Sequence, residues 1–207
     1  LEKVYGNLLS EFAKAFSKND PLFKLSIYYP FNHLVIPKDE LDDYDMKEGR
    51  LAGIVRLIRA GILKRFESSY MAFKVSCHNL LLKNVAWLHE FGRIKGYETR
   101  LDEWLKENGR HVRHAREINP LIEHDEDEEL GDNLHDIPHL KLTDWAKEGP
   151  FNIEGIVKDA FEDIDQIVKF LSLMDDITPE SDDKVQKLVE LLESDKMANN
   201  GKIIIFS

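Results

Sequence analysis

The longest helical signal in this chain lies in residues 47–90, which read KEGRLAGIVRLIRAGILKRFESSYMAFKVSCHNLLLKNVAWLHE. Apolar side chains recur there every three or four residues, from Leu51 to Leu88, and this spacing is typical of a helix with one packed face. If unbroken, the helix would extend for roughly 60 Å, at about 1.5 Å per residue. The pair Ser68–Ser69 is the place where we expect it to bend.

Further apolar stripes surround this long helix. Residues 1–18 and 153–176 repeat apolar side chains at helical spacing, and Asn152 precedes the second stripe as a good N-cap. The second stripe has the length to lie antiparallel to the long helix. Shorter helices are expected at 98–107 and 180–195. The pattern therefore predicts a mainly α fold, a helical bundle of long antiparallel helices.

The segments between these stripes differ in character. Residues 22–37 are aromatic and β-branched but interrupted by Pro30 and Pro37, which predicts an extended packed segment with at most a short strand. Residues 109–138 lack apolar periodicity and run from basic to acidic. We expect an irregular charged loop there.

The last residues, 202–207, read KIIIFS and predict the opening of a buried parallel β-strand. A lone strand leaves its backbone groups unpaired, so we expect its sheet to lie beyond Ser207 in a longer protein. The helical bundle would then carry a short C-terminal β-strand stub. The expected domains are 1–46, an N-terminal helix with an extended segment; 47–176, a helical insertion domain; and 177–207, a helix plus the first strand of a following lobe.

The 207 residues carry a net charge of −11 and are 43% hydrophobic, which excludes collagen-like and fully disordered classes. Residues 47–116 hold 15 Lys and Arg against 7 Asp and Glu, whereas 117–195 hold 6 against 24. Either the two halves pack together and neutralise each other, or the basic half faces a polyanion such as DNA or RNA. The single Cys77 suits a reducing, cytoplasmic compartment. The apolar runs are too short to span a membrane.

Motifs for catalysis or metal binding are absent from the sequence. It has no phosphate-binding Gly-x-x-x-x-Gly-Lys loop, no Gly-x-Ser-x-Gly and no His-Glu-x-x-His. The pairs His111/His114 and His135/His139 have helix-compatible spacing, but catalytic zinc needs three ligands held by an ordered surrounding shell. We therefore expect surface histidines, and no catalytic, cofactor or metal residue.

The candidate nucleic-acid contacts are Arg56, Arg59, Lys64 and Arg65, which lie within three turns of the long helix. Basic side chains along a helix face contact phosphates spaced along a nucleic acid. The alternative is ion pairing with the acidic helix 153–176.

Two segments together resemble a known family. Residues 59–73 read RAGILKRFESSYMAF, and residues 183–192 read DKVQKLVELL, followed by GKIIIFS at 201–207. The first resembles a stretch of bacterial Swi/Snf-type helicases of superfamily 2. The second resembles the helix and strand that open the second RecA-like lobe of such motors.

The resemblance implies that the chain is the helical region between two RecA-like ATPase lobes, ending on the first strand of lobe two. The whole protein would bind ATP and Mg²⁺ and act on nucleic acid, with double-stranded DNA expected. The catalytic motifs of the family would lie outside this chain, so the chain alone would couple lobe movement to nucleic-acid contact. The alternative is a helical protein–protein interaction module whose acidic surface docks a partner.

Overall fold

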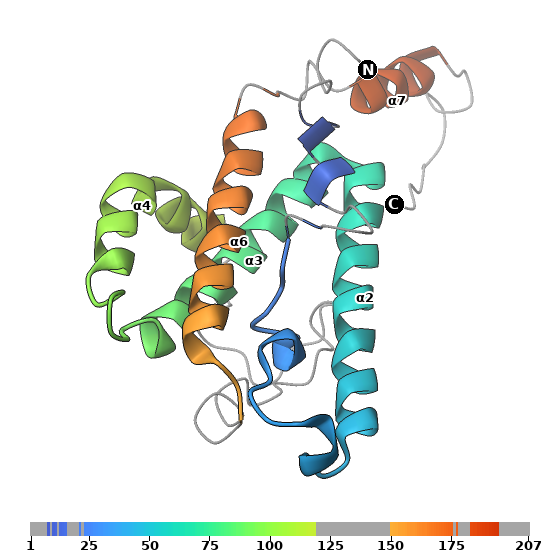
Figure 1. Ribbon diagram of the computed structural model, residues 1–207. Coiled ribbons are helices and arrows are strands. Elements are labelled where there is room, and N and C mark those ends of the chain that lie inside the picture. The colour runs from blue at the N-terminus through green and yellow to red at the C-terminus, as the bar shows by residue number, and fades with distance from the viewer. Residues whose placement is uncertain are drawn as a thin grey trace.

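The computed structural model describes residues 8, 10, 11, 13–15, 21, 23–118, 150–175, 177 and 183–194. The described part is mainly helical, and the predicted helical bundle is confirmed (Figure 1). Its elements are the 3₁₀ turns η1 (Pro30–His33) and η2 (Lys38–Glu40) and the helices α2 (Tyr44–Ser68), α3 (Tyr70–Phe91), α4 (Arg100–Ile118), α6 (Ile153–Leu173) and α7 (Asp183–Ser194).

Helix α3 is the centre of the bundle, and α2, α4 and α6 all pack against it (Figure 1). Its side chains Phe73, Leu81 and Leu88 are fully buried, and Phe73 meets Phe170 of α6 edge-on, with ring centroids 5.7 Å apart. Burial of apolar surface from four helices in one cluster is the main stabilising contribution of the fold.

The helical signal over 47–90 corresponds to two helices, so the length of roughly 60 Å that an unbroken helix would have does not apply. Ser69 takes an extended conformation with φ −156° and ψ 155°, which ends α2. Its Oγ accepts a hydrogen bond from the N–H of Ala72 at 3.0 Å and so caps the start of α3. Because Ser69 caps the second helix from an extended conformation, the first helix ends there. The sequence predicted a bend within one helix at this point, whereas the structure has a boundary between two helices.

Helix α6 matches its prediction. The Asn152 side chain accepts from the N–H of Gly155 at 3.2 Å, as an N-cap does. Lys74, near the start of α3, pairs with Asp175, just past the end of α6, at 3.3 Å, so the two helices run antiparallel. The buried stripe of α6 includes Ile156, Val157, Ala160, Ile164, Ile167 and Leu171.

Helix α4 corrects two predictions. The helix expected at 98–107 continues to Ile118, so the irregular loop expected over 109–138 is wrong for 109–118. His111, Val112 and Ala115 are buried on the bundle. They extend the stripe begun by Leu101 and Trp104 at helical spacing, and the basic residues of the stretch occupy the other side.

Several predictions lie outside the described residues. These are the loop residues 119–138, the terminal strand and most of the helix at 1–18, of which residues 8, 10, 11 and 13–15 are helical. Helix α7 occupies most of the helix expected at 180–195.

The segment 23–34 is bound to α6 by two carboxylates. Buried Asp163 accepts from the backbone N–H groups of Lys24 at 2.7 Å and Leu25 at 2.8 Å, and Leu25 has a left-handed φ of 55°. One turn earlier, Asp159 accepts from Ser26 Oγ at 2.5 Å and binds the His33 imidazole at 2.7 Å. The short strand allowed by the sequence is a single bridge between residues 34 and 151.

The acidic side of α6 therefore meets partners that the charge pattern did not predict. Asp165 accepts from the indole N–H of Trp104 at 2.7 Å. Together with the contacts of Asp159 and Asp163, the partners are backbone amides, a hydroxyl, an indole and an imidazole. The alternative of pairing with Arg and Lys does not hold for these three carboxylates, whereas Asp175, at the end of the expected helix 153–176, pairs with Lys74 at 3.3 Å and Arg110 at 3.7 Å.

Removal of the Asp163 carboxylate should destabilise the fold strongly. D163A leaves the buried N–H of Leu25 and the half-buried N–H of Lys24 without their acceptor, at a cost of about 1–3 kcal/mol each, so the free energy of unfolding should fall by about 2–6 kcal/mol in urea denaturation. The exposed Glu162 next to it supplies the control, and E162A should change the free energy of unfolding by no more than about 0.5 kcal/mol. Equal effects of the two variants would contradict the anchoring role.

The pH dependence of this effect has a defined sign. Burial raises the pKa of Asp163 from 3.8 to about 7, against the opposing effect of the two N–H donors. The stability linked to this raised pKa is present in full below pH 4 and is lost as pH rises to 7. D163N does not titrate, so its stability relative to the wild type should rise by about 2 kcal/mol between pH 5 and pH 8.

Candidate functional site

Helix α2 packs on one side only. Leu51, Val55, Ile58 and Ile62 are buried, toward α3 and the segment 23–31. The opposite side is exposed, and we call it the outer face of α2. It consists of the exposed residues Met46, Arg50, Arg56, Leu57, Ala60, Leu63, Lys64 and Glu67 and the half-buried Gly53.

The structure brings two of the four candidate nucleic-acid residues onto this face. Arg56 and Lys64 are exposed, and Arg50 joins them, two turns before Leu57, which itself lies two turns before Lys64. Among the described residues, none of the three cations lies in an ion pair. Their charges are therefore available to an anionic partner.

The other two candidates do not share the face. Arg59 is half-buried, and its Nη2 donates to the carbonyl oxygen of Phe23 at 3.3 Å, while its Nε is buried without a partner in the described part of the chain. Arg65 is also half-buried, toward the packed side. We assign Arg59 a structural role, because its guanidinium holds the segment that Asp163 anchors.

Sequence reasoning missed the apolar component of the outer face. Met46 is 68% exposed, Leu57 57% and Leu63 38%. These residues fall outside the three-to-four residue rhythm that predicted the packed stripe. The sequence did contain a signal for this component, namely apolar side chains at positions outside the packed stripe. A helix that is buried on one face alone has no need of apolar side chains on its other face.

Charge is unevenly distributed along the surface that leads into this face. Between residues 38 and 47, five acidic side chains and two lysines are exposed. Between residues 50 and 65 there is no acidic residue, and there are five Lys and Arg. The surface is therefore acidic over residues 38–47 and basic over residues 50–65, and the exposed Glu67 follows one turn after Lys64.

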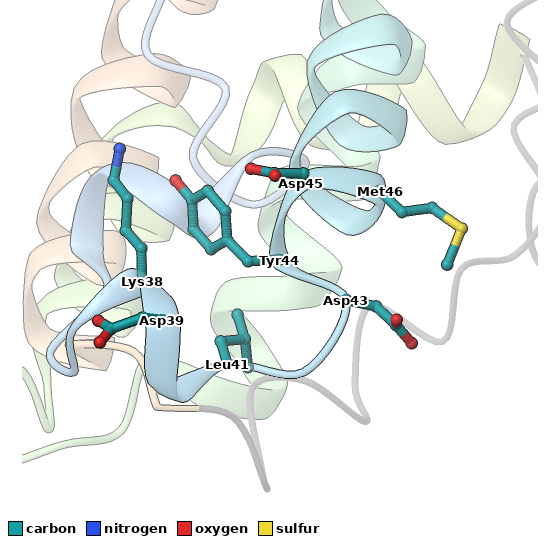
Figure 2. Close-up of a pocket in the computed structure, with 7 residues that line it drawn as sticks. All are labelled: Lys38, Asp39, Leu41, Asp43, Tyr44, Asp45 and Met46. Atoms are coloured by element: carbon teal, nitrogen blue, oxygen red, sulfur yellow. The ribbon is translucent and has the colours of Figure 1, made fainter.

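An open hollow of about 570 Å³ lies at the acidic end (Figure 2). The Lys38 ammonium stands over the Tyr44 ring, 5.3 Å from its centroid, and Tyr44 packs edge-on against Phe31. The hollow holds carboxylates but no converging set. It is lined by Lys38, Asp39, Leu41, Asp43, Tyr44, Asp45 and Met46.

A histidine group lies between α3 and α4. His78 is buried, and neither ring nitrogen has a hydrogen-bond partner among the described residues. The exposed His114 meets it edge-on with ring centroids 5.2 Å apart, and buried His111 accepts from Nε of Arg110 at 3.2 Å. The sequence predicted surface histidines, which is wrong for His111. The pair His135/His139 lies outside the described residues.

No metal-binding cluster forms in the described part of the chain, and two candidate sets for nucleophilic catalysis lack the arrangement that they would need. No three His, Cys, Asp or Glu side chains are placed there to hold a metal ion. Ser26, His33 and Asp159 have the residue types of a hydrolytic triad, but both Ser26 and His33 bind the carboxylate, and Ser26 is fully buried. Cys77 is buried, and burial raises the pKa of its thiol, which disfavours the thiolate that a nucleophilic cysteine needs.

No protein-family model, curated protein or solved structure matches this chain. Within the described residues, no helix is both long and apolar enough to cross a membrane.

Acid should destabilise the fold through His78. Burial lowers the pKa of its imidazole from 6.5 to about 4, and the charges of His114, Lys74 and His111 act in the same direction, against Asp175. The neutral ring fits the fold, so this stability is present above pH 6.5 and is lost as pH falls to 4. H78L should therefore gain about 2 kcal/mol relative to the wild type between pH 7 and pH 5.

Urea denaturation of both proteins at the two pH values measures this gain, and the common effect of Asp163 cancels in the difference. The surface variant H89L on the same helix is the control for loss of a histidine. A difference between H78L and the wild type that does not change with pH would contradict the assignment.

Proposed function

We propose that this chain is a non-catalytic helical coupling domain, the part of a Swi/Snf-type ATPase that lies between two RecA-like lobes in the cytoplasm. Support comes from the resemblance of residues 59–73 and 183–207 and from the outer face of α2. ATP and Mg²⁺ would bind to the lobes, and double-stranded DNA would contact this domain. The basic outer face is the single observation that carries the proposal.

The packing of the helices suits a mechanical role. Helix α2 has 25 residues and extends for about 37 Å. It shares one core with α3, α4 and α6, so a displacement applied at one end moves the bundle as a unit. A rigid body that joins two moving lobes transmits their closure to whatever its exposed face touches.

The outer face supplies the cations for a contact to phosphates. Arg50, Arg56 and Lys64 lie along about 20 Å of helix, with spacings of about 9 and 12 Å along its axis. Cations in this arrangement bind the phosphate backbone without reading bases, so the contact would be independent of sequence and sensitive to salt.

A second candidate function is a protein–protein interaction module. The exposed apolar side chains Met46, Leu57 and Leu63 on the same face favour it, because contact with phosphates does not require them. The apolar stripe of α7 is also half-buried or exposed, with Leu188 at 38% and Val189 at 41% exposure.

Charge reversal on the outer face tests the nucleic-acid contact. We expect R56E/K64E to weaken the binding of a fluorescent DNA duplex at least tenfold near 0.1 M salt. The slope of log K against log salt should fall by about two, since two phosphate contacts are lost. Fluorescence anisotropy across a salt series measures both quantities.

The variant K106E/R113E is a matched control, because it makes the same charge change on exposed positions of α4. It should keep the salt slope of the wild type. If the two variants lost the same amount of DNA affinity, the loss would be explained by net charge alone, and the outer face would be rejected as the binding site. In a protein that includes both lobes, R56E/K64E should abolish DNA stimulation of ATP hydrolysis and keep the basal rate.

A further inference from the structure

We infer that the outer face of α2 is a self-association surface, on which a second copy of this chain packs its own α2 in the antiparallel direction. This inference goes beyond the proposed function, because the partner is the chain itself. It uses apolar side chains and an acidic segment that contact with DNA leaves unexplained.

The apolar component of the face requires a partner with apolar surface. Three of the large apolar side chains that are exposed among the described residues lie on one side of one helix. They are Met46, Leu57 and Leu63. Aligned apolar side chains of this kind mark a protein interface, whereas isolated ones are ordinary. Helix-to-helix packing would cover them on both copies at once.

The order of charges selects the direction of packing. The surface is acidic over residues 38–47 and basic over residues 50–65. A two-fold axis brings the same patch of both copies together, so each end meets the opposite end only if the helices are antiparallel. A parallel pair would place acidic beside acidic and basic beside basic, which is repulsive.

The positions of particular residues give a register. Asp45 and Lys64 are 19 residues apart, or about 28 Å along the axis, and both are exposed. With the two-fold axis midway between them, Asp45 and Lys64 of the other copy lie at the same level at both ends, as do Met46 and Leu63. Each pair is about 100° apart around the helix, and the long Lys64 side chain spans this offset to reach the carboxylate. Gly53 lies beside the axis with no atom within 4 Å of where a Cβ would stand, so the helices can approach closely there.

The same surface then serves two partners that exclude each other. The second copy covers Arg56 and Lys64, so a DNA duplex and a second copy compete for these cations. The acidic segment 38–47 repels phosphates but attracts Lys64 of another copy. A second copy can therefore cover both the acidic and the basic part of this surface, whereas DNA can contact only the basic part.

Sedimentation equilibrium of the 207-residue chain over a concentration series tests the inference. The wild type should pass from monomer to dimer, and L57E should stay monomeric. D45K and K64D should each weaken the dimer at least tenfold, because each places like charges opposite each other. The double variant D45K/K64D exchanges the two charges and should restore the dimer.

Three results would overturn the inference: a wild type that stays monomeric at the highest concentration, a dimer unaffected by L57E, or a double variant weaker than both single ones. K106D on α4 is the control for a reversed lysine and should dimerise as the wild type does. D45K separates the two proposals, because it should weaken the dimer without weakening DNA binding. Loss of the dimer with intact DNA binding would leave the coupling function standing.

Discussion

Helix α3 has to bury most of its circumference, and the places of the other helices follow from this requirement. Its apolar side chains point toward α2, α4 and α6 in turn, and a helix that is apolar on nearly all sides is stable in water only when neighbours cover it. This arrangement depends on Ser69. By capping α3 and ending α2, it lets α2 fold back as one of the covering helices.

Burial on all sides also constrains the polar groups of α3. Ser76 donates to the carbonyl oxygen of Ala72, and Asn84 donates to that of Leu80, so each uses its own helix as the partner. His78 finds no such partner and stays neutral, because desolvation disfavours its charged form. The cost of covering α3 therefore falls on the His78 imidazole, beside the basic side chains of α4, and on Oδ1 of Asn84, which is also buried without a partner among the described residues.

The periodic part of the fold could be predicted from the sequence, because helical stripes and N-caps such as Asn152 are local signals. The extension of α4 was missed because His111 occupies an apolar position and basic neighbours obscured Val112 and Ala115. The Asp163 anchor could not be predicted, since its partners lie 138 or more residues away in the sequence. For the candidate site, spacing selected Arg56 and Lys64, which are exposed, together with two half-buried residues. It could not separate them from Arg59, whose orientation depends on the distant segment around Phe23.

The charge asymmetry of the sequence has a different physical outcome from the one its totals suggest. If acidic α6 neutralised basic α2, the outer face would be occupied by internal ion pairs. Instead Asp159, Asp163 and Asp165 are used by hydroxyl, backbone and indole donors. The cations of the outer face have no carboxylate partner within the described part of the chain, and screening by salt is then the main limit on the distance over which they attract an anion.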